Sequence, residues 1–193
     1  MLTKTLVGAI MLLLFAFVIT GSFLKKHETF FNIHEVVKQH LSLFRKCKYQ
    51  YVVFYGYPLL FAIGLALIYE ANATFYSEVS VLIGILLSML LAILSILTGF
   101  DFSVVENEFQ KAKVKKVVSE TINAIVFNAI LCIFMMIYGL AIIVLGGVDF
   151  SWIPIDLTII SGIAYYIFVV ILLTLLLIVK HMSKIIEFKN AKR

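Results

Sequence analysis

The stretch Val79–Phe100, VSVLIGILLSMLLAILSILTGF, contains no charged residue and decides the fold class. A helix needs about 20 apolar residues to cross a hydrocarbon core about 30 Å thick, and it satisfies its own backbone polar groups in lipid. Four other apolar runs of similar length lie at 6–24, 51–69, 122–147 and 157–179. Because 63% of all residues are hydrophobic, the sequence predicts an all-α, polytopic helical membrane protein.

The five apolar segments predict two transmembrane hairpins and an N-terminal anchor helix. The second and third segments form one hairpin, and the fourth and fifth form the other. The first segment has a second interpretation as a cleaved signal peptide, because Lys4 precedes it and Thr20-Gly21-Ser22 lies near its end. Cleavage would leave the basic residues that follow on the outer side, so an anchor helix is preferred. No Ser, Gly or Pro-rich linker divides the chain, and 1–193 is treated as one domain.

Lysine and arginine are distributed unevenly along the chain. All sixteen except Lys4 lie in three segments, 25–48, 101–120 and 180–193, and the two short loops within the hairpins contain none. The positive-inside rule therefore predicts that these three segments are cytosolic, with the N-terminus outside and the C-terminus inside. The absence of a long outer domain favours a bacterial inner membrane.

Two basic connectors, 29–48 and 103–120, are predicted to be cytosolic amphipathic helices that continue into the spans after them. In the first connector, apolar residues recur at helical spacing: Phe30, Ile33, Val37, Leu41 and Phe44. Both connectors begin with the pattern of a capping box, Asn32 with Glu35 and Ser103 with Glu106.

The spans lack the residues that most membrane chemistry requires. None contains Asp, Glu, Lys, Arg or His, which argues against an ion-coupled transporter. His34-Glu35 and His40 resemble a zinc-protease motif, but the second histidine comes two residues too late to share a helix face with the first. We expect these imidazoles to face lipid headgroups. Ser161 has no His or Asp in a span to activate it, so no enzyme activity, metal site or cofactor is predicted.

The basic connectors supply candidate residues for docking a partner or anionic lipid. A lysine near an anionic surface contributes about 1 kcal/mol, whereas direct contact with nucleic acid is the less favoured interpretation. Plain topology determination is the alternative to any docking role. The candidates are Lys38, Arg45, Lys46, Lys48, Lys111, Lys113, Lys115 and Lys116.

Four polar residues within the spans are candidates for helix packing or for lining a pore: Ser88, Ser95, Asn123 and Asn128. Such side chains usually hydrogen-bond across helices or to their own backbone, and packing is the preferred interpretation. A water-filled path remains the alternative.

The run Gly84–Thr98, GILLSMLLAILSILT, with the size of the chain and its hairpins, resembles the KwaA family, the small multi-span membrane components of Kiwa anti-phage systems. The resemblance covers most of the chain and transfers no individual functional residue. That family has four spans. The resemblance implies a bacterial inner-membrane protein that oligomerises, responds to phage at the envelope and works with a cytosolic DNA-binding partner, KwaB.

Together these observations predict a non-enzymatic membrane scaffold or sensor. We expect it to contact membrane lipids, to form a homo-oligomer and to dock a cytosolic protein partner. The alternative is a small oligomeric protein that forms a pore or depolarises the membrane, since short outer loops and small residues in the spans are compatible with a channel.

Overall fold

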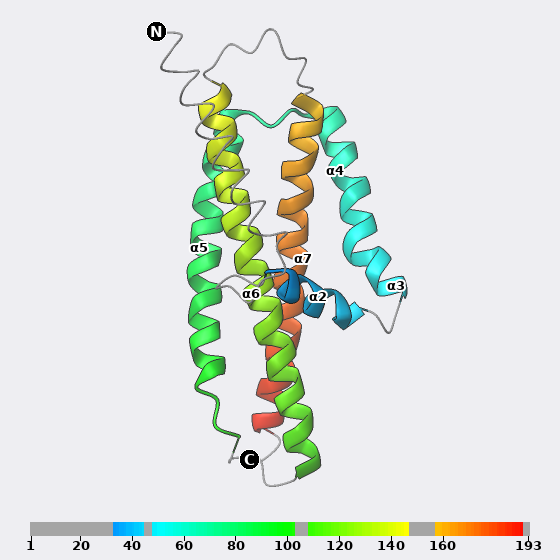
Figure 1. The fold of residues 1–193 in the computed structure, drawn as a ribbon, viewed down its shortest axis with the longest axis vertical. Coiled ribbons are helices and arrows are strands. Elements are labelled where there is room, and N and C mark those ends of the chain that lie inside the picture. Colours follow the sequence, from blue (N-terminus) through cyan, green and yellow to red (C-terminus); the bar gives the residue numbers. More distant parts are fainter. Residues whose placement is uncertain (1–32, 45–47, 103–107, 147–156, 191–193) are drawn as a thin grey trace.

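The computed structural model describes residues 33–44, 48–102, 108–146 and 157–190 (Figure 1). These residues form helices and no strand, which confirms an all-α polytopic membrane protein. Four helical stretches are long and apolar enough to cross a membrane: Tyr49–Ile68, Ala73–Thr98, Glu108–Val144 and Leu157–Phe188. The predicted segment 6–24, and with it the anchor helix, lies outside the described residues.

The described elements follow one another as α2 (Ile33–Phe44), α3 (Lys48–Tyr51), the π-helix η1 (Val52–Gly56), α4 (Tyr57–Ile68), α5 (Ala73–Thr98), α6 (Glu108–Gly146) and α7 (Leu157–Asn190). Helices α4 to α7 run side by side along the long axis of the molecule (Figure 1). α6 packs between α5 and α7, and α7 packs in turn between α6 and α4. The partner of α4 is therefore α7, although α4 and α5 are consecutive in the chain.

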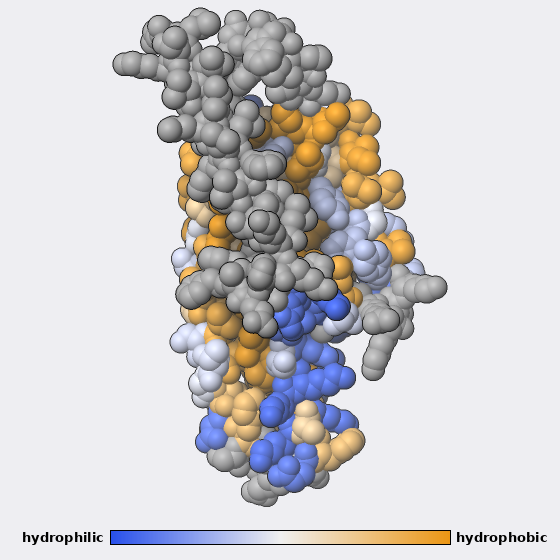
Figure 2. Space-filling view, viewed as in Figure 1, coloured by the Kyte–Doolittle hydropathy of each residue, from blue (hydrophilic) through white to orange (hydrophobic). Residues whose placement is uncertain are grey.

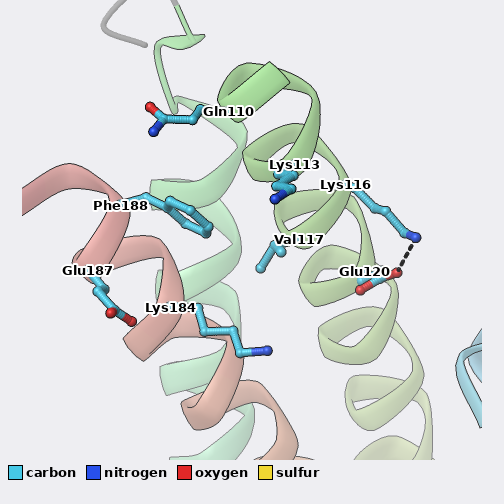
Figure 3. A pocket seen from close by; sticks show the side chains of 8 residues that line it. All are labelled: Gln110, Lys113, Lys116, Val117, Glu120, Lys184, Glu187 and Phe188. Atoms are coloured by element: carbon cyan, nitrogen blue, oxygen red, sulfur yellow. Dashed lines mark ion pairs between the residues drawn. The ribbon is translucent and has the colours of Figure 1, made fainter. Parts of the chain in front are cut away.

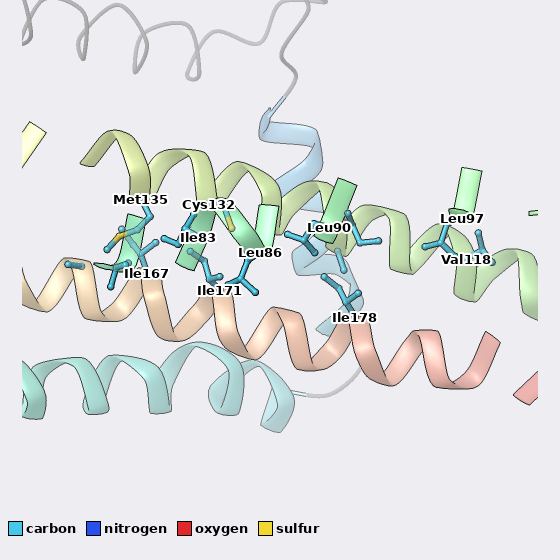
Figure 4. Close-up of a cluster of buried hydrophobic side chains, with 14 of the residues drawn as sticks. Ile83, Leu86, Leu90, Leu97, Val118, Cys132, Met135, Ile167, Ile171 and Ile178 are labelled. Carbon is cyan, nitrogen blue, oxygen red and sulfur yellow. The ribbon is translucent and has the colours of Figure 1, made fainter. Parts of the chain in front are cut away.

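Helices α5, α6 and α7 share one continuous buried seam, which we call the central seam (Figure 4). Its residues recur at alternating spacings of three and four, the pattern by which helices pack side chains into one another in coiled coils. On α6 the buried positions are Val114, Val118, Thr121, Ile125, Asn128, Cys132 and Met135. On α5 they include Ile83, Leu86, Leu90 and Leu97, and on α7 Ile171, Thr174, Ile178 and Ile185. The seam thus passes from the apolar spans into the polar end of the molecule without interruption.

Helix α4 joins the bundle through small residues. Ala62 and Ala66 are buried against α7, and a methyl group added at Gly162 would lie 3.6 Å from Cβ of Ala66. Small side chains let two helices approach closely where no hydrophobic driving force from water acts. The opposite face of α4 exposes large apolar side chains such as Leu60 and Leu67, as a lipid-facing helix does.

The connection between α4 and α5 is shorter than the predicted loop at 70–78. The Asn72 side chain accepts a hydrogen bond from the Phe75 N–H at 2.9 Å and so caps α5, which begins at Ala73. The Ser161 hydroxyl accepts another from the Ala71 N–H at 2.9 Å. These bonds satisfy backbone donors at the turn and tie it to α7.

The π-helix η1 lies immediately before Pro58. Proline has no N–H, and its ring clashes with the carbonyl four residues earlier, so the backbone widens there. The Tyr57 N–H donates to the Val52 carbonyl, five residues back. A proline one turn into the span thus explains the irregular start of α4.

The two basic connectors differ in structure. α6 is a single helix from Glu108 to Gly146, so the predicted continuation of the second connector into its span is confirmed. α2 ends at Phe44, and α3 begins separately at Lys48. In Figure 1, α2 lies across α6 rather than in line with α4. The prediction of one continuous helix is therefore wrong for the first connector.

Helix α2 is amphipathic as predicted, with one exception. Its polar face, including Glu35 and Lys38, is exposed, but His40 is fully buried and stacks on Phe127 of α6, with ring centroids 3.9 Å apart and planes 9° apart. Burial disfavours the charged imidazole and lowers the pKa of His40 to about 4. The expectation that this imidazole faces lipid headgroups is wrong, because its flat ring fills the contact between α2 and α6.

Candidate docking cleft at the basic end of the bundle

The end of the bundle where α6 begins and α7 ends, which we call the basic end, carries most of the charge of the described residues. Figure 2 shows hydrophilic side chains gathered toward this end, and hydrophobic ones over much of the remaining coloured surface. A cleft of about 570 Å³ lies between the two helices (Figure 3). Its lining residues are Gln110, Lys113, Lys116, Val117 and Glu120 from α6 and Lys184, Glu187 and Phe188 from α7. We call it the basic-end cleft.

The cleft exists because α7 continues well past the predicted end of its span at 179. Ile178 and Ile185 are buried, and Met182 and Phe188 pack against the same cluster. This spacing keeps one apolar stripe of α7 against α6 for three more turns. The stripe is visible in the sequence, but the lysines of 180–193 predict only that this segment is cytosolic. Lys184, Glu187 and Phe188 are therefore not identified from the sequence.

The charged residues near the cleft differ in their partners. Lys111 pairs with Glu108 at 3.4 Å, and Lys116 pairs with Glu120 at 4.0 Å. Both are local pairs along one helix with an exposed member, a kind that contributes little to stability. They engage two of the four lysines of α6, and Lys113 and Lys115 have no ion pair among the described residues.

Two lysines of the cleft have no carboxylate at ion-pairing distance among the described residues. Lys113 places its Nζ 4.2 Å from the centroid of the exposed Phe109 ring, a cation–π contact. Lys184 extends from α7 toward α6, and the Phe188 ring points into the same space (Figure 3). The cleft therefore has a positive charge on each wall and an apolar surface, Val117 with Phe188, between them.

The other predicted docking residues lie elsewhere. Lys115 is exposed but does not line the cleft, and Lys38 is on the exposed face of α2. Lys48 begins α3, and nothing of its side chain is described, while Arg45 and Lys46 lie outside the described residues. The structure thus brings together Lys113 and Lys116 from the predicted set and adds Lys184.

The predicted polar span residues do not form one site. Ser88 and Ser95 are exposed on the outer face of α5, and the Ser88 hydroxyl donates to the Gly84 carbonyl at 3.0 Å. Asn123 is half-buried. Asn128 is fully buried in the central seam, and within the described residues neither its Oδ1 nor its Nδ2 has a hydrogen-bond partner. No continuous polar path joins these four side chains in the single chain that the structure describes.

Nothing in the described part of the chain brings together three His, Cys, Asp or Glu side chains as a metal site would need. Fold and cleft together define a class, a polytopic α-helical membrane protein whose spans extend beyond the apolar region as a charged helical pair. No protein-family model matches this chain, and no curated protein or solved structure matches it significantly.

Proposed function

We propose that this protein is a non-enzymatic membrane scaffold or sensor that forms oligomers and docks a soluble cytosolic partner in the basic-end cleft. One observation carries the proposal: helices from two different parts of the chain place Lys113 and Lys184 on facing walls, without an ion-pair partner among the described residues. Charges held ready on a rigid helical pair are suited to recognising a charged partner.

The distribution of basic residues supports a cytosolic location for this cleft. Lys111, Lys113, Lys115, Lys116, Lys180 and Lys184 all lie at the basic end, and the other end of the described bundle has no lysine or arginine. The positive-inside rule then orients the bundle with the cleft toward the cytosol.

Reversing Lys113, Lys115 and Lys116 to Glu tests the docking proposal. The chain would be expressed with its neighbouring genes and purified in mild detergent, and native mass spectrometry would weigh the complex. We expect the unchanged chain to carry a soluble partner at fixed stoichiometry and the reversed variant to lose it. Because lysines also set topology, a C-terminal fluorescent reporter must show that the variant inserts normally. Unchanged partner binding by a correctly inserted variant would reject the docking function.

An exposed stripe on α5 supports oligomerisation. Ser77, Gly84, Ser88, Ala92 and Ser95 lie on the outer face of that helix at helical spacing, with the larger Val81 between the first two. Nothing lies within 4 Å of a methyl group added at Gly84. Stripes of small residues let helices from different chains pack closely in lipid. Replacing Gly84 by Leu should therefore shift the detergent-solubilised protein toward the monomer in native mass spectrometry.

The same stripe favours a second candidate function, an oligomeric pore. Ser88 and Ser95 are exposed in one chain, and a ring of chains meeting through α5 would turn these hydroxyls toward a shared axis. Strong expression should then depolarise cells, and Ser95→Leu should change the conductance in planar bilayers. A normal membrane potential under strong expression would remove the pore from consideration.

The resemblance to the KwaA family extends the proposal to anti-phage defence in a bacterial inner membrane, with a KwaB-like DNA-binding protein as the soluble partner. Deleting the gene should then raise phage plating efficiency only when the partner gene is present. Equal phage plating efficiency with and without the gene would reject the anti-phage role, and the scaffold proposal would stand independently of it.

A further inference from the structure

The distance between the basic-end cleft and the membrane favours a soluble protein over a lipid as its ligand. Gln110 precedes Ile122, the first residue of the apolar run, by 12 residues, or about 18 Å along a helix axis. The headgroup layer beyond the hydrocarbon is only about 6 Å thick on each side. Most of the cleft therefore lies in water beyond the headgroups.

Helix α2 contacts α6 at Phe127, five residues inside the apolar run that begins at Ile122. Its exposed polar face and its contact with Phe127 fit a helix that lies along the membrane surface at that level. Lys113 lies nine residues before Ile122 along helix α6, about 14 Å from the start of the apolar run. A lipid phosphate cannot reach Lys113 at that distance without leaving the bilayer.

The shape and charge of the cleft indicate what kind of protein segment fits it. Lys113 and Lys184 on opposite walls suit carboxylates on one face of a segment, while Val117 and Phe188 suit an apolar side chain between them (Figure 3). A volume of about 570 Å³ holds a few side chains rather than a folded domain. Glu187 carries negative charge at the rim and would repel a carboxylate placed beside it. The carboxylates of the bound segment are therefore expected next to Lys113 and Lys184, away from Glu187.

We infer that the occupant of the cleft is an acidic amphipathic helix of the soluble partner, with glutamates or aspartates one turn apart and one large apolar residue. This inference rests on the proposed docking function and specifies its chemistry. It assigns the pair Lys113 and Lys184 as the determinants of partner charge, and Phe188 as the apolar contact.

The test uses the full chain in nanodiscs of neutral phosphatidylcholine and a defined probe. The probe is a fluorescein-labelled helical peptide with two pairs of glutamates spaced four residues apart and one central leucine. A second peptide carries glutamine in place of each glutamate. Fluorescence anisotropy at about 0.15 M salt, where the Debye length is about 8 Å, should show that the glutamate peptide binds at least about tenfold more tightly.

Two double variants with identical net charge locate the binding. Lys113→Glu with Lys184→Glu should weaken the glutamate peptide at least about tenfold and abolish the preference over the glutamine peptide. Lys115→Glu with Lys180→Glu changes the same two helices outside the cleft and should keep the affinity within about threefold. Phe188→Ala should weaken both peptides equally, because it removes only an apolar contact.

Three results would overturn the inference. One is equal binding of the two peptides, another is equal weakening by the two double variants, and the third is loss of peptide binding when phosphatidylglycerol is added to the nanodisc. Binding of the native partner to the same variants distinguishes failure of the acidic-helix inference from failure of the docking function. If that partner still depends on Lys113 and Lys184 while the glutamate peptide shows no preference, the acidic-helix chemistry is wrong and the docking function stands.

Discussion

Helix α2 and the first turns of α6 have the same sequence pattern and different structures. Each is amphipathic, with lysine on the polar face. α2 is a separate helix that lies across α6 and buries His40 on Phe127. The beginning of α6 continues straight from its span, because Val114 and Val118 extend the central seam against α5 and α7. Amphipathic periodicity thus predicts that a helix has a buried face. What that face packs against depends on which other helices extend alongside it, as α5 and α7 do beside the start of α6.

This difference has a functional consequence. The apolar face of α2 is used for packing on the bundle, whereas the pair formed by α6 and α7 extends beyond the apolar region and keeps an open cleft between its polar faces. In the first connector, α2 therefore covers the bundle at Phe127. The second connector, with the end of α7, offers the candidate docking site.

The largest effect is expected from breaking the seam in the extended pair. Val118 is buried between α5, α6 and α7, so Val118→Asp would place an unpaired charge there and should destabilise the protein by about 4 kcal/mol. Thermal unfolding in detergent, followed by fluorescence-detected gel filtration, measures this change. Ser119→Asp, at the adjacent exposed position, should have almost no effect. Similar melting of the two variants would show that the extension does not pack as described.

An acidic pH should separate α2 from α6. The pKa of His40 is about 4 when buried, against 6.5 as its ordinary value, so the undocked state binds more protons between these values. The contribution of α2 docking is therefore full above pH 6.5 and is lost as the pH falls toward 4. The total loss is of the order of 3 kcal/mol.

Hydrogen exchange of α2 at pH 7 and pH 4.5 tests this dependence. Exchange corrected for its intrinsic pH dependence should become faster at pH 4.5 in the unchanged protein. His40→Phe keeps a flat ring on Phe127 but cannot titrate, so protection of α2 should then be independent of pH. A pH-dependent α2 in that variant would assign the effect to another group.

Asn128→Leu should stabilise the protein by about 1–2 kcal/mol. The Asn128 amide is fully buried next to the α2 contact, without a hydrogen-bond partner among the described residues, and a buried unsatisfied polar group is costly. The melting temperature in detergent measures the change, with the half-buried Asn123 replaced by Leu as the control. A lower melting temperature for Asn128→Leu would indicate that Asn128 hydrogen-bonds in the assembled protein, as pore lining or interchain packing requires.

The smallest effect is expected from the local ion pairs of α6. Glu108 is 87% exposed and pairs with Lys111 within the same first turn. Glu108→Gln should change stability by less than about 0.5 kcal/mol, as measured by thermal unfolding at low and high salt. A larger, salt-sensitive loss would mean that these charges hold the extended pair together and are not available for docking.

Much of this architecture follows from residues seen in the sequence alone. The run Val79–Phe100 and its three described counterparts predicted four spans. The expectation that each connector continues into the next span predicted one long α6, but the same expectation is wrong for the connector 29–48. The start of α5 at Ala73 was missed because capping by Asn72 depends on geometry that a hydropathy pattern does not contain.

The candidate site was only partly predictable. Lys113 and Lys116 were identified by their charge, but Lys184 and Phe188 join them only because two segments distant in sequence pack antiparallel. The burial of His40 depends on the position of Phe127 in space. Periodicity within one helix describes its own faces, and it does not specify which residues of another helix meet them.

Cysteine labelling tests most directly whether the cleft is open to water on the cytosolic side. In a background with Cys47→Ser and Cys132→Ala, single cysteines would replace Lys113, Lys184 or the buried Ile125, and a membrane-impermeant maleimide would be added to oriented vesicles. We predict that Lys113→Cys and Lys184→Cys react only in inside-out vesicles and that Ile125→Cys reacts in neither orientation. Reaction of the first two variants in right-side-out vesicles, or no reaction in either, would contradict the proposed docking cleft.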